Sequence, residues 1–300
     1  MLKIVESKED LLKALDSTQA CPELLFIHCS IEVQLKNSFP EAQLSLWLYE
    51  KDSGEQLWIS FRESDTCHRY VCIGAKLGSN FEDSELFQVF SRLEDKYPTL
   101  FVIGHGSVVF AANPTLEIYK RWINQKTGHE NEFIGVTQQY FYMTEEQKES
   151  ILKLNLELPD GYHFANIDIE KDSEEITSIT SLGNHRDLAQ NRAMLEHMPY
   201  VMLRKNISNE LVAFELVDPI YILRNQFTHE NHRGKGLGNF MERFLAQKII
   251  RDGKTPYKVV IATNKPVIDA SQRSQYWTRL ENNENIIEVG VVRSYKPLTC

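Results

Sequence analysis

The chain lacks any apolar run long enough to cross a membrane, which takes about 18 consecutive apolar residues. Its first residues, MLKIVESKEDLLKALDS, hold no long apolar segment, so a secretory signal is not expected. Acidic residues at positions 6, 9 and 10 also argue against an Arg-rich transit peptide. We therefore expect a cytoplasmic protein with no membrane partner.

Cysteine is scarce as well. The five cysteines are an odd number, and no CxxC pair is present. A chain of 300 residues does not need disulfides to hold its core, so we expect reduced thiols. His229 and His232 are not accompanied by a CxxC or HExxH motif, and we expect no metal site.

An excess of positive charge is also missing, since the formal net charge is −9. This balance disfavours a general nucleic-acid binder. The charge is uneven, however: residues 229–258 carry seven Lys or Arg against three acids. Such a run can be only a solvated helix face. Around a glycine-rich turn it also fits the binding of a small polyanion.

The length favours two domains. A turn at Pro159, Asp160 and Gly161 suggests an N-terminal α/β domain over 1–156 and a second α/β domain over 157–300. No repeat is visible in the sequence, although both halves could share one topology. In the first half, periodicity predicts helices over 7–17, 83–97, 113–128 and 144–154 and strands over 42–50, 55–61, 99–104 and 132–143. In the second half it predicts strands over 162–167, 200–205, 211–217, 220–228, 258–263 and 286–295 and helices over 171–182, 186–197, 237–252 and 269–280.

Two further stretches contain residue types found in catalytic motifs. FIHCS (26–30) reads as a strand, in which His28 and Cys29 would point to opposite faces and could not act together. GHGSVV (104–109) lacks the GxSxG pattern of a nucleophile turn. Neither stretch predicts a catalytic site.

The stretch HENHRGKGLG (229–238) is the strongest functional motif. It follows an apolar strand and precedes a helix, and it contains R-x-x-G-x-G as Arg233, Gly236 and Gly238. It matches neither the Walker pattern nor the dinucleotide GxGxxG. Glycines at a strand-to-helix turn let backbone N–H groups approach an anion. The alternative is that these glycines serve packing alone.

This motif resembles the coenzyme A loop of the GNAT superfamily of acyl-CoA N-acyltransferases. Within that superfamily, the stretches QQYFYMTEEQKESILKLNLELPDGYHF, RDLAQNRAMLEHMP and YVMLRKNISNELVAFELVD are similar to the glycine N-acyltransferase-like family in the same order. The likeness covers roughly 138–300. It implies a mixed, splayed β-sheet flanked by helices, preceded by a degenerate N-terminal α/β domain. It also leaves a mitochondrial location open.

The resemblance implies roles for particular residues. Gln226, Phe227 and Thr228 would lie on the splayed strand that pairs with the pantetheine arm. The pyrophosphate would be held, mainly by backbone N–H groups, by Arg233, Gly234, Lys235, Gly236, Leu237 and Gly238. Asn264 would follow the strand across the splay. Tyr276 would lie on the next helix and protonate the leaving thiolate, with Trp277 as the alternative occupant of that position.

The resemblance also exposes a departure. The family's general base is a glutamate on the strand entering the loop, and this chain has Ile222 there. An ammonium acceptor must lose a proton before it attacks. Glu215, Asp218 and His229 are close in sequence, and His229 has the most suitable unperturbed pKa.

These observations predict an acyl-CoA-dependent N-acyltransferase that binds no permanent cofactor and uses acyl-CoA as co-substrate. The acceptor would be a glycine-like amino acid or another small amine. Two alternatives remain open: an acyl-CoA-binding protein without transferase activity, and a transferase acting on protein or polyamine amines. The sequence does not predict an oligomeric state.

Overall fold

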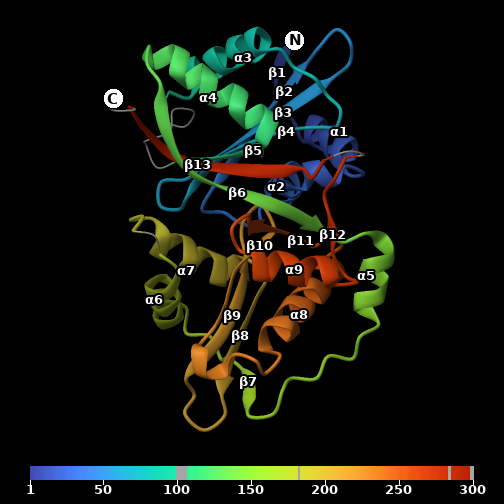
Figure 1. Ribbon diagram of the computed structural model, residues 1–300, viewed down its shortest axis with the longest axis vertical. Coiled ribbons are helices and arrows are strands. Elements are labelled where there is room, and N and C mark those ends of the chain that lie inside the picture. Colours follow the sequence, from blue (N-terminus) through green and yellow to red (C-terminus); the bar gives the residue numbers. More distant parts are fainter. Residues whose placement is uncertain (99–106, 182, 283–284, 298–300) are drawn as a thin grey trace. The chain divides into compact units, whose positions relative to one another are not determined.

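A computed structural model describes residues 1–98, 107–181, 183–282 and 285–297 (Figure 1). The strand predicted over 99–104 and part of GHGSVV lie outside these residues. In the first half the elements are β1 Leu2–Val5, α1 Lys8–Thr18, η1 Pro22–Leu24, α2 Leu25–Lys36, β2 Gln43–Glu50, β3 Gln56–Glu63, β4 Arg69–Ala75, α3 Asp83–Lys96, β5 Ser107–Ala112, α4 Asn113–Thr127 and β6 Asn131–Tyr142.

In the second half the elements are α5 Glu145–Leu152, β7 Tyr162–Phe164, α6 Ile169–Thr180, α7 Asp187–His197, β8 Tyr200–Lys205, β9 Leu211–Val217, β10 Ile222–Thr228, η2 Glu230–His232, α8 Leu237–Arg251, β11 Tyr257–Ile261, α9 Lys265–Arg273, β12 Thr278–Arg279 and β13 Glu288–Pro297. Apart from the 3₁₀ turns, α5 and β12, each half runs strand, two helices, three strands, helix, strand, helix, strand. The shared topology predicted for the two halves is therefore confirmed.

The chain divides into two compact units. The first contains Met1–Tyr140, Val260–Ile268 and Arg279–Cys300, and the second contains Phe141–Val259 and Asp269–Thr278. Compactness divides the chain differently from the order of elements, because the last strand of the chain, β13, belongs to the first unit. The functional domains 1–156 and 157–300 stay a prediction.

The sheet of the first unit has the strand order β1-β2-β3-β4-β5-β13-β6. Neighbouring strands are antiparallel except for β4 and β5, which run parallel. Alternate residues such as Leu57, Ile59 and Phe61 point to one face of β3 and pack against α3 and α4. Phe110 belongs to the other face, where its ring meets Phe26 of α2 at 5.0 Å. Helices therefore cover both faces of this sheet.

One predicted strand of the first half is wrong. Residues 26–30 lie in α2, which ends at Asn37 in the left-handed conformation (φ 48°). A short apolar run does not distinguish a buried strand from a buried helix, and here tertiary packing decides. The His28 Nδ1 lies 3.1 Å from the Thr18 hydroxyl. That His28 and Cys29 form no catalytic pair stays a prediction.

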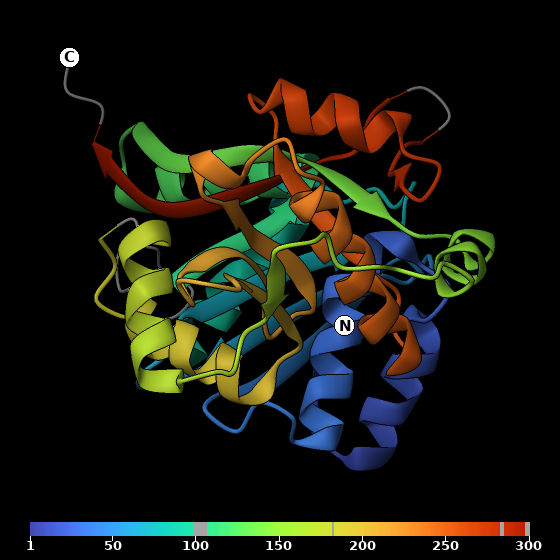
Figure 2. The same cartoon turned by 90° about the horizontal axis from the view of Figure 1, so that it is seen from below.

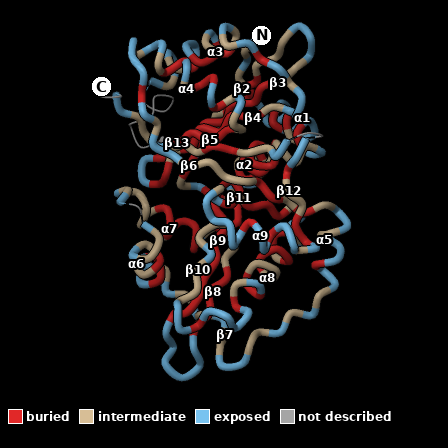
Figure 3. The backbone as a smooth tube through the Cα atoms, in the orientation of Figure 1, coloured by how far each residue is buried: buried red, intermediate tan, exposed pale blue. Residues whose placement is uncertain are grey.

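The second unit has the strand order β11-β10-β9-β8-β7, with β10 and β11 parallel and the other pairs antiparallel. Figure 2 shows α6 and α7 on one side of β8, β9 and β10, and α8 on the other. Every residue of β9 is buried, as its red trace in Figure 3 shows. Among the described residues, no helix is both long and apolar enough to cross a membrane.

Candidate functional site

The loop between β10 and α8 has the backbone conformation that its glycines permit. Gly234 and Gly236 adopt positive φ angles of 73° and 78°. A side chain at either position would be strained, although no atom lies within 4 Å of where its Cβ would be. Gly236 is also the N-cap of α8. The strand, glycine turn and helix predicted for 220–252 are thus confirmed as structure.

The same loop leaves a row of N–H donors available. Across the described ranges no acceptor is found for the backbone N–H groups of residues 234–239. The first helical bond runs from the Phe240 N–H to the Gly236 carbonyl at 3.0 Å. The N-cap has no side chain, and the first turn carries no acidic residue. Uncapped N–H groups at the positive end of a helix dipole form a site for an anion.

The side chains of Arg233 and His232 fix the conformation of this loop. The Arg233 Nε donates to the Thr228 carbonyl at 2.9 Å, which ties the loop to the end of β10. His232 is buried, and its Nδ1 lies 2.9 Å from the Tyr162 hydroxyl. Desolvation, helped by the nearby Lys235, lowers the pKa of His232 below its ordinary value, so the ring stays neutral. Arg233 and His232 therefore shape the loop, while Lys235 is exposed.

The strands in front of the loop separate. β10 and β11 pair only at Ile222 with Tyr257 and at Leu223 with Lys258. Beyond this point the pairing of β10 with β9 also shifts register between Arg224 and Phe227, and Asn225 has a φ of 57°. Gln226, Phe227 and Thr228 therefore follow the last paired residue, on the splayed part of the strand as predicted.

The position at which the resemblance expects a general base is buried. Ile222 is only 5 % exposed and lies where β10 and β11 still pair. Asp218 does not replace it, because its Oδ1 accepts from the N–H groups of Ile220 at 2.9 Å and Ile222 at 3.2 Å. Its Oδ2 lies 3.6 Å from Arg224. Asp218 thus builds the turn before β10.

Glu215 is a buried acid on β9. Its side chain accepts from the Gln226 Nε2 at 3.2 Å. Burial, followed by repulsion from Glu242, raises the pKa of Glu215 to about 8. The sequence signal for this residue is a single acid within the apolar stretch LVAFELV, and from the sequence alone only its closeness to the loop is apparent.

Sequence reasoning missed a buried cluster made by Glu242, Lys258 and Trp277. The Trp277 Nε1 donates to one Glu242 oxygen at 2.7 Å, and the Lys258 ammonium pairs with the other. Lys258 also lies 4.4 Å from the centre of the Trp277 ring. The three residues are far apart in sequence, so only folding reveals their proximity. Trp277 has its N–H committed to Glu242.

The helix predicted over 269–280 is too long. α9 ends at Arg273, and Tyr276 lies in the turn that follows. Ser274 explains the end of the helix, because its hydroxyl accepts from the Tyr276 N–H at 3.3 Å and competes with helical bonding. Tyr276 is 8 % exposed, and Arg243 of α8 lies 5.2 Å from its ring centre. Its predicted role as proton donor is untested.

His229 and Asn264 complete the predicted residues. The His229 N–H donates to the Val212 carbonyl at 2.9 Å, and its ring meets the Phe227 ring edge-on at 4.9 Å. Asn264 lies at the start of α9, where its carbonyl accepts from the Ile268 N–H at 3.1 Å. Asn264 belongs to the first unit and the loop to the second, so a shared coenzyme contact stays a prediction.

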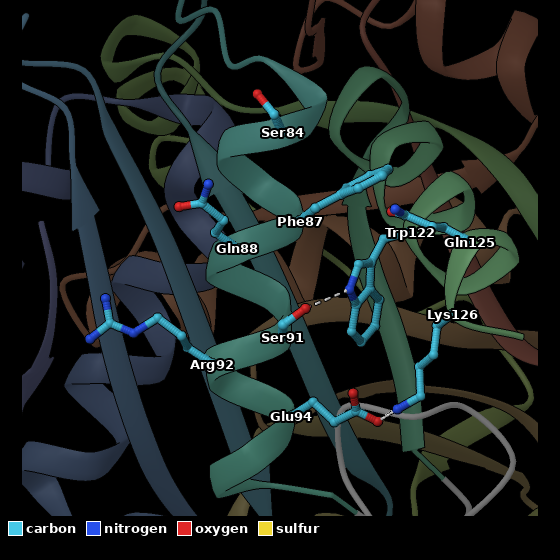
Figure 4. A pocket seen from close by; sticks show the side chains of 9 residues that line it. All are labelled: Ser84, Phe87, Gln88, Ser91, Arg92, Glu94, Trp122, Gln125 and Lys126. Atoms are coloured by element: carbon cyan, nitrogen blue, oxygen red, sulfur yellow. Dashed lines mark hydrogen bonds and ion pairs between the residues drawn. The ribbon is translucent and has the colours of Figure 1, made fainter.

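A groove of about 770 Å³ lies between α3 and α4 of the first unit (Figure 4). Four of its lining residues are paired: the Trp122 Nε1 donates to Ser91 at 3.1 Å, and Lys126 pairs with Glu94. None of the predicted site residues lines it. The groove therefore adds nothing to the candidate site.

Comparison with known proteins agrees with this geometry. Residues 200–277 match the family described as FR47-like protein. A Drosophila melanogaster protein solved as a structural-genomics target is similar over 97% of this chain and 98% of its own, with 12% identity and a TM-score of 0.69. A GCN5-related N-acetyltransferase from Sphaerobacter thermophilus is similar over 98% and 95%, with 11% identity and a TM-score of 0.54.

A tandem GNAT protein from the clavulanic acid biosynthesis pathway is similar over 98% of this chain and 99% of its own, with 12% identity and a TM-score of 0.50. No curated protein matches the sequence. At these identities the likeness establishes the fold. The chain has a mixed α/β fold of the GNAT type, as the sequence predicted.

Proposed function

We propose that this protein is an acyl-CoA-dependent N-acyltransferase whose coenzyme site is formed by β10, the glycine loop and α8. The observation that carries the proposal is the row of N–H groups at residues 234–239, which have no acceptor in the described chain and stand at an uncapped helix start. A pyrophosphate supplies the acceptors and negative charge that such a cradle binds. Exposed Lys235 adds a cation.

The splay beside this cradle takes the rest of the coenzyme. Residues 226–228 follow the last β10–β11 pair, so this part of β10 lacks a parallel neighbour and offers its backbone to the amides of a pantetheine arm. Residues 157–300 then form the coenzyme-binding domain. Residues 1–156 support it or shape the acceptor cleft, which predicts one coenzyme per chain.

In the proposed reaction the neutral amine attacks the thioester carbonyl directly. A C–N bond forms, the C–S bond breaks, the amine loses one proton and the leaving thiolate gains one. Tyr276 is the proposed donor to the thiolate. His229, which directly follows β10, is the proposed acceptor of the amine's proton. A glycine-like amino acid, as in the glycine N-acyltransferase-like family, is the first acceptor to test.

A second function is favoured by one observation. Ile222 is buried at the family's base position, and Asp218 is committed to backbone N–H groups. A protein that binds acyl-CoA but transfers no acyl group would show this arrangement.

An acidic chain, with a net charge of −9, would also suit cationic acceptors such as polyamines or protein amines.

The deciding experiment combines calorimetry with acetyl-CoA and a thiol-release assay. The assay would pair short and aromatic acyl-CoAs with glycine, other amino acids, polyamines and a lysine peptide. Binding with thiol release supports the transferase, and the best amine identifies the acceptor class. Binding without release for any pair supports the binding protein. Absence of binding, or two sites per chain, would overturn the proposed site.

A further inference from the structure

The Gln226 side chain joins the glycine loop to a buried acid. Its Nε2 donates to the Glu215 Oε2 and to the Gly238 carbonyl, each at 3.2 Å. Since one nitrogen makes both bonds, the acid lies within two hydrogen-bond lengths of the first turn of α8. The Gly238 Cα is also close, because a Cβ there would be 3.3 Å from the Gln226 Oε1. Gln226 thus packs against the start of the helix.

Among the residues that the structure describes, no cation forms an ion pair with Glu215. The charged groups that face it are Glu242 from α8 and Lys258 from β11, and β10 contributes the neutral Gln226. Opposite it on β8 lies Val201, which does not titrate. Lys258 pairs with Glu242, so the lysine charge is shared. Glu215 itself is 3 % exposed and therefore poorly solvated.

We propose that Gln226 is a positioning residue for the N–H cradle and that Glu215 behind it makes coenzyme affinity depend on pH. The inference rests on the proposed function for the identity of the ligand. When Glu215 is protonated, this residue places no negative charge next to the N–H groups of the cradle. Ionised Glu215 places a carboxylate behind the N–H groups that hold the pyrophosphate, and the two negative charges repel through a poorly solvated interior.

The direction of the effect follows from the chemistry. Below about pH 8 the Glu215 carboxyl is mostly uncharged, because burial raises its pKa. Coenzyme affinity is therefore highest near neutral pH and falls as the pH rises through this value. By linkage, the bound coenzyme raises the pKa of Glu215 further. The second pKa of a phosphate monoester is about 6, so most of its titration lies below this range, and the added negative charge favours binding to N–H donors rather than weakening it.

Calorimetry with acetyl-CoA at pH 7, 8 and 9 tests the inference. We expect the wild-type affinity to weaken roughly tenfold across this range, which corresponds to the repulsion between two unit charges about 12 Å apart at an effective dielectric of about 20. Glu215→Gln should bind with no such slope. Gln226→Leu should bind more weakly at every pH, because Gly238 loses its contact. A wild-type slope in Glu215→Gln would overturn the inference.

Gln247 provides a matched control on the same helix. Its Nε2 also bridges two acceptors, the carbonyls of Ile151 at 2.8 Å and Leu154 at 3.0 Å, but neither is an acid. Gln247→Leu removes these two hydrogen bonds, and the one that Gln247 Oε1 accepts from Arg251 at 3.1 Å, without touching Glu215 or the loop. We expect its acetyl-CoA profile to match the wild type. A profile like that of Gln226→Leu would show a merely structural effect and contradict the positioning role.

A second measurement separates this inference from the proposed function. In protein labelled with ¹³C at glycine carbonyls, the Gly238 signal should titrate near pH 8 without any ligand, and Glu215→Gln or Gln226→Leu should abolish the titration. Titration without acetyl-CoA binding would support the coupling and overturn the proposed function. Absence of titration in the wild type would overturn the coupling, whether or not acetyl-CoA binds.

Discussion

Both halves contain a strand–turn–helix–strand segment whose two strands are parallel neighbours. In the described residues these strands stay paired in the first half and separate early in the second. In the first half β4 and β5 pair over five residues, from Arg69 with Ser107 to Ile73 with Ala111. In the second half β10 and β11 pair over two residues and then separate. Strands paired in this way have no free backbone edge between them. The described residues 69–73 and 107–111 therefore leave no gap like the one after Leu223.

The N-termini of α3 and α8, the helices of these two segments, also differ. The N-cap of α3 is Glu82, whose N–H donates to the Glu85 carboxylate at 2.9 Å, and Asp83 adds a second charge to the first turn. The N-cap of α8 is Gly236, so this helix has neither a side-chain cap nor an acid in its first turn. An acidic cap occupies N–H groups and repels anions. Common topology thus permits a site, and local side chains decide whether one exists.

The largest effect is expected from a charged substitution at Ile222, where β10 and β11 still pair. Ile222 is buried between paired strands, so Ile222→Glu places an unpaired carboxylate in a dry position. We expect the free energy of unfolding at pH 8 to fall by about 3–5 kcal/mol, with a smaller loss at pH 5, where the new acid takes up a proton. Urea unfolding at both pH values measures this, with Ile222→Met as control. An equally stable variant with faster thiol release would show instead that this position faces the amine.

The glycines of the two turns provide the next test. Gly236 and Gly78 both have positive φ, 78° and 85°, and no atom lies within 4 Å of the place where a Cβ would be. Alanine at either should cost about 1–2 kcal/mol of stability. Only Gly236→Ala should weaken acetyl-CoA binding, by tenfold or more, because each lost charge-assisted hydrogen bond costs about 1–3 kcal/mol. Equal affinities of the two variants in calorimetry would count against the cradle.

A smaller effect is expected from giving α8 the acid of α3. Asn239 is exposed in the first turn of α8, at the position that Glu85 has in α3. Asn239→Glu should raise stability by about 0.3–1 kcal/mol through the helix dipole. It should weaken acetyl-CoA binding five- to tenfold, roughly 1 kcal/mol of repulsion. Opposite signs in thermal unfolding and calorimetry distinguish this effect from damage, and Asn239→Gln is the neutral control.

The smallest effect is expected from the reverse change in the first half. A backbone hydrogen bond lowers the pKa of Glu85, aided by Lys51 at 3.1 Å. A lowered pKa means that the stabilisation is present above the unfolded value near 4.5 and is lost as the pH falls below it. Glu85→Gln should therefore cost about 0.5–1 kcal/mol at pH 7, and progressively less as the pH falls through the lowered pKa of Glu85. A second acetyl-CoA site in this variant would show that the acid alone had blocked one.

Much of the fold could be predicted because its signals are local. Thr144 and Gln147 form the capping box that their spacing predicts. Helix α8 begins at Leu237, directly after the glycine loop. Errors arise where the local signal is ambiguous: the pattern predicts a strand where α2 forms, and it extends α9 past Ser274. In both places packing or a side-chain hydrogen bond overrides the pattern.

Some features of the candidate site could likewise be predicted from the sequence, and others could not. The RxxGxG loop, its flanking strand and its helix follow from the residue types, since glycine adopts the positive φ angles of positions 234 and 236 without strain. The roles of Glu215 and Gln226 do not follow, because a bulge in β10 turns Gln226 toward a residue on another strand. The cluster of Glu242, Lys258 and Trp277 likewise joins residues separated in sequence. Long-range contacts carry no local periodicity, so a single sequence does not reveal them.

The sequence by itself determined an acidic chain of two α/β halves, with one glycine-rich, basic turn at a helix start in the second. Composition, apolar spacing and glycine conformation are local properties, and they suffice for these conclusions. Tertiary structure alone decided that β13 pairs between β5 and β6, that β10 and β11 separate after Leu223, and that a buried acid stands behind the loop. Each of these depends on strand register and burial, which arise only when distant segments pack.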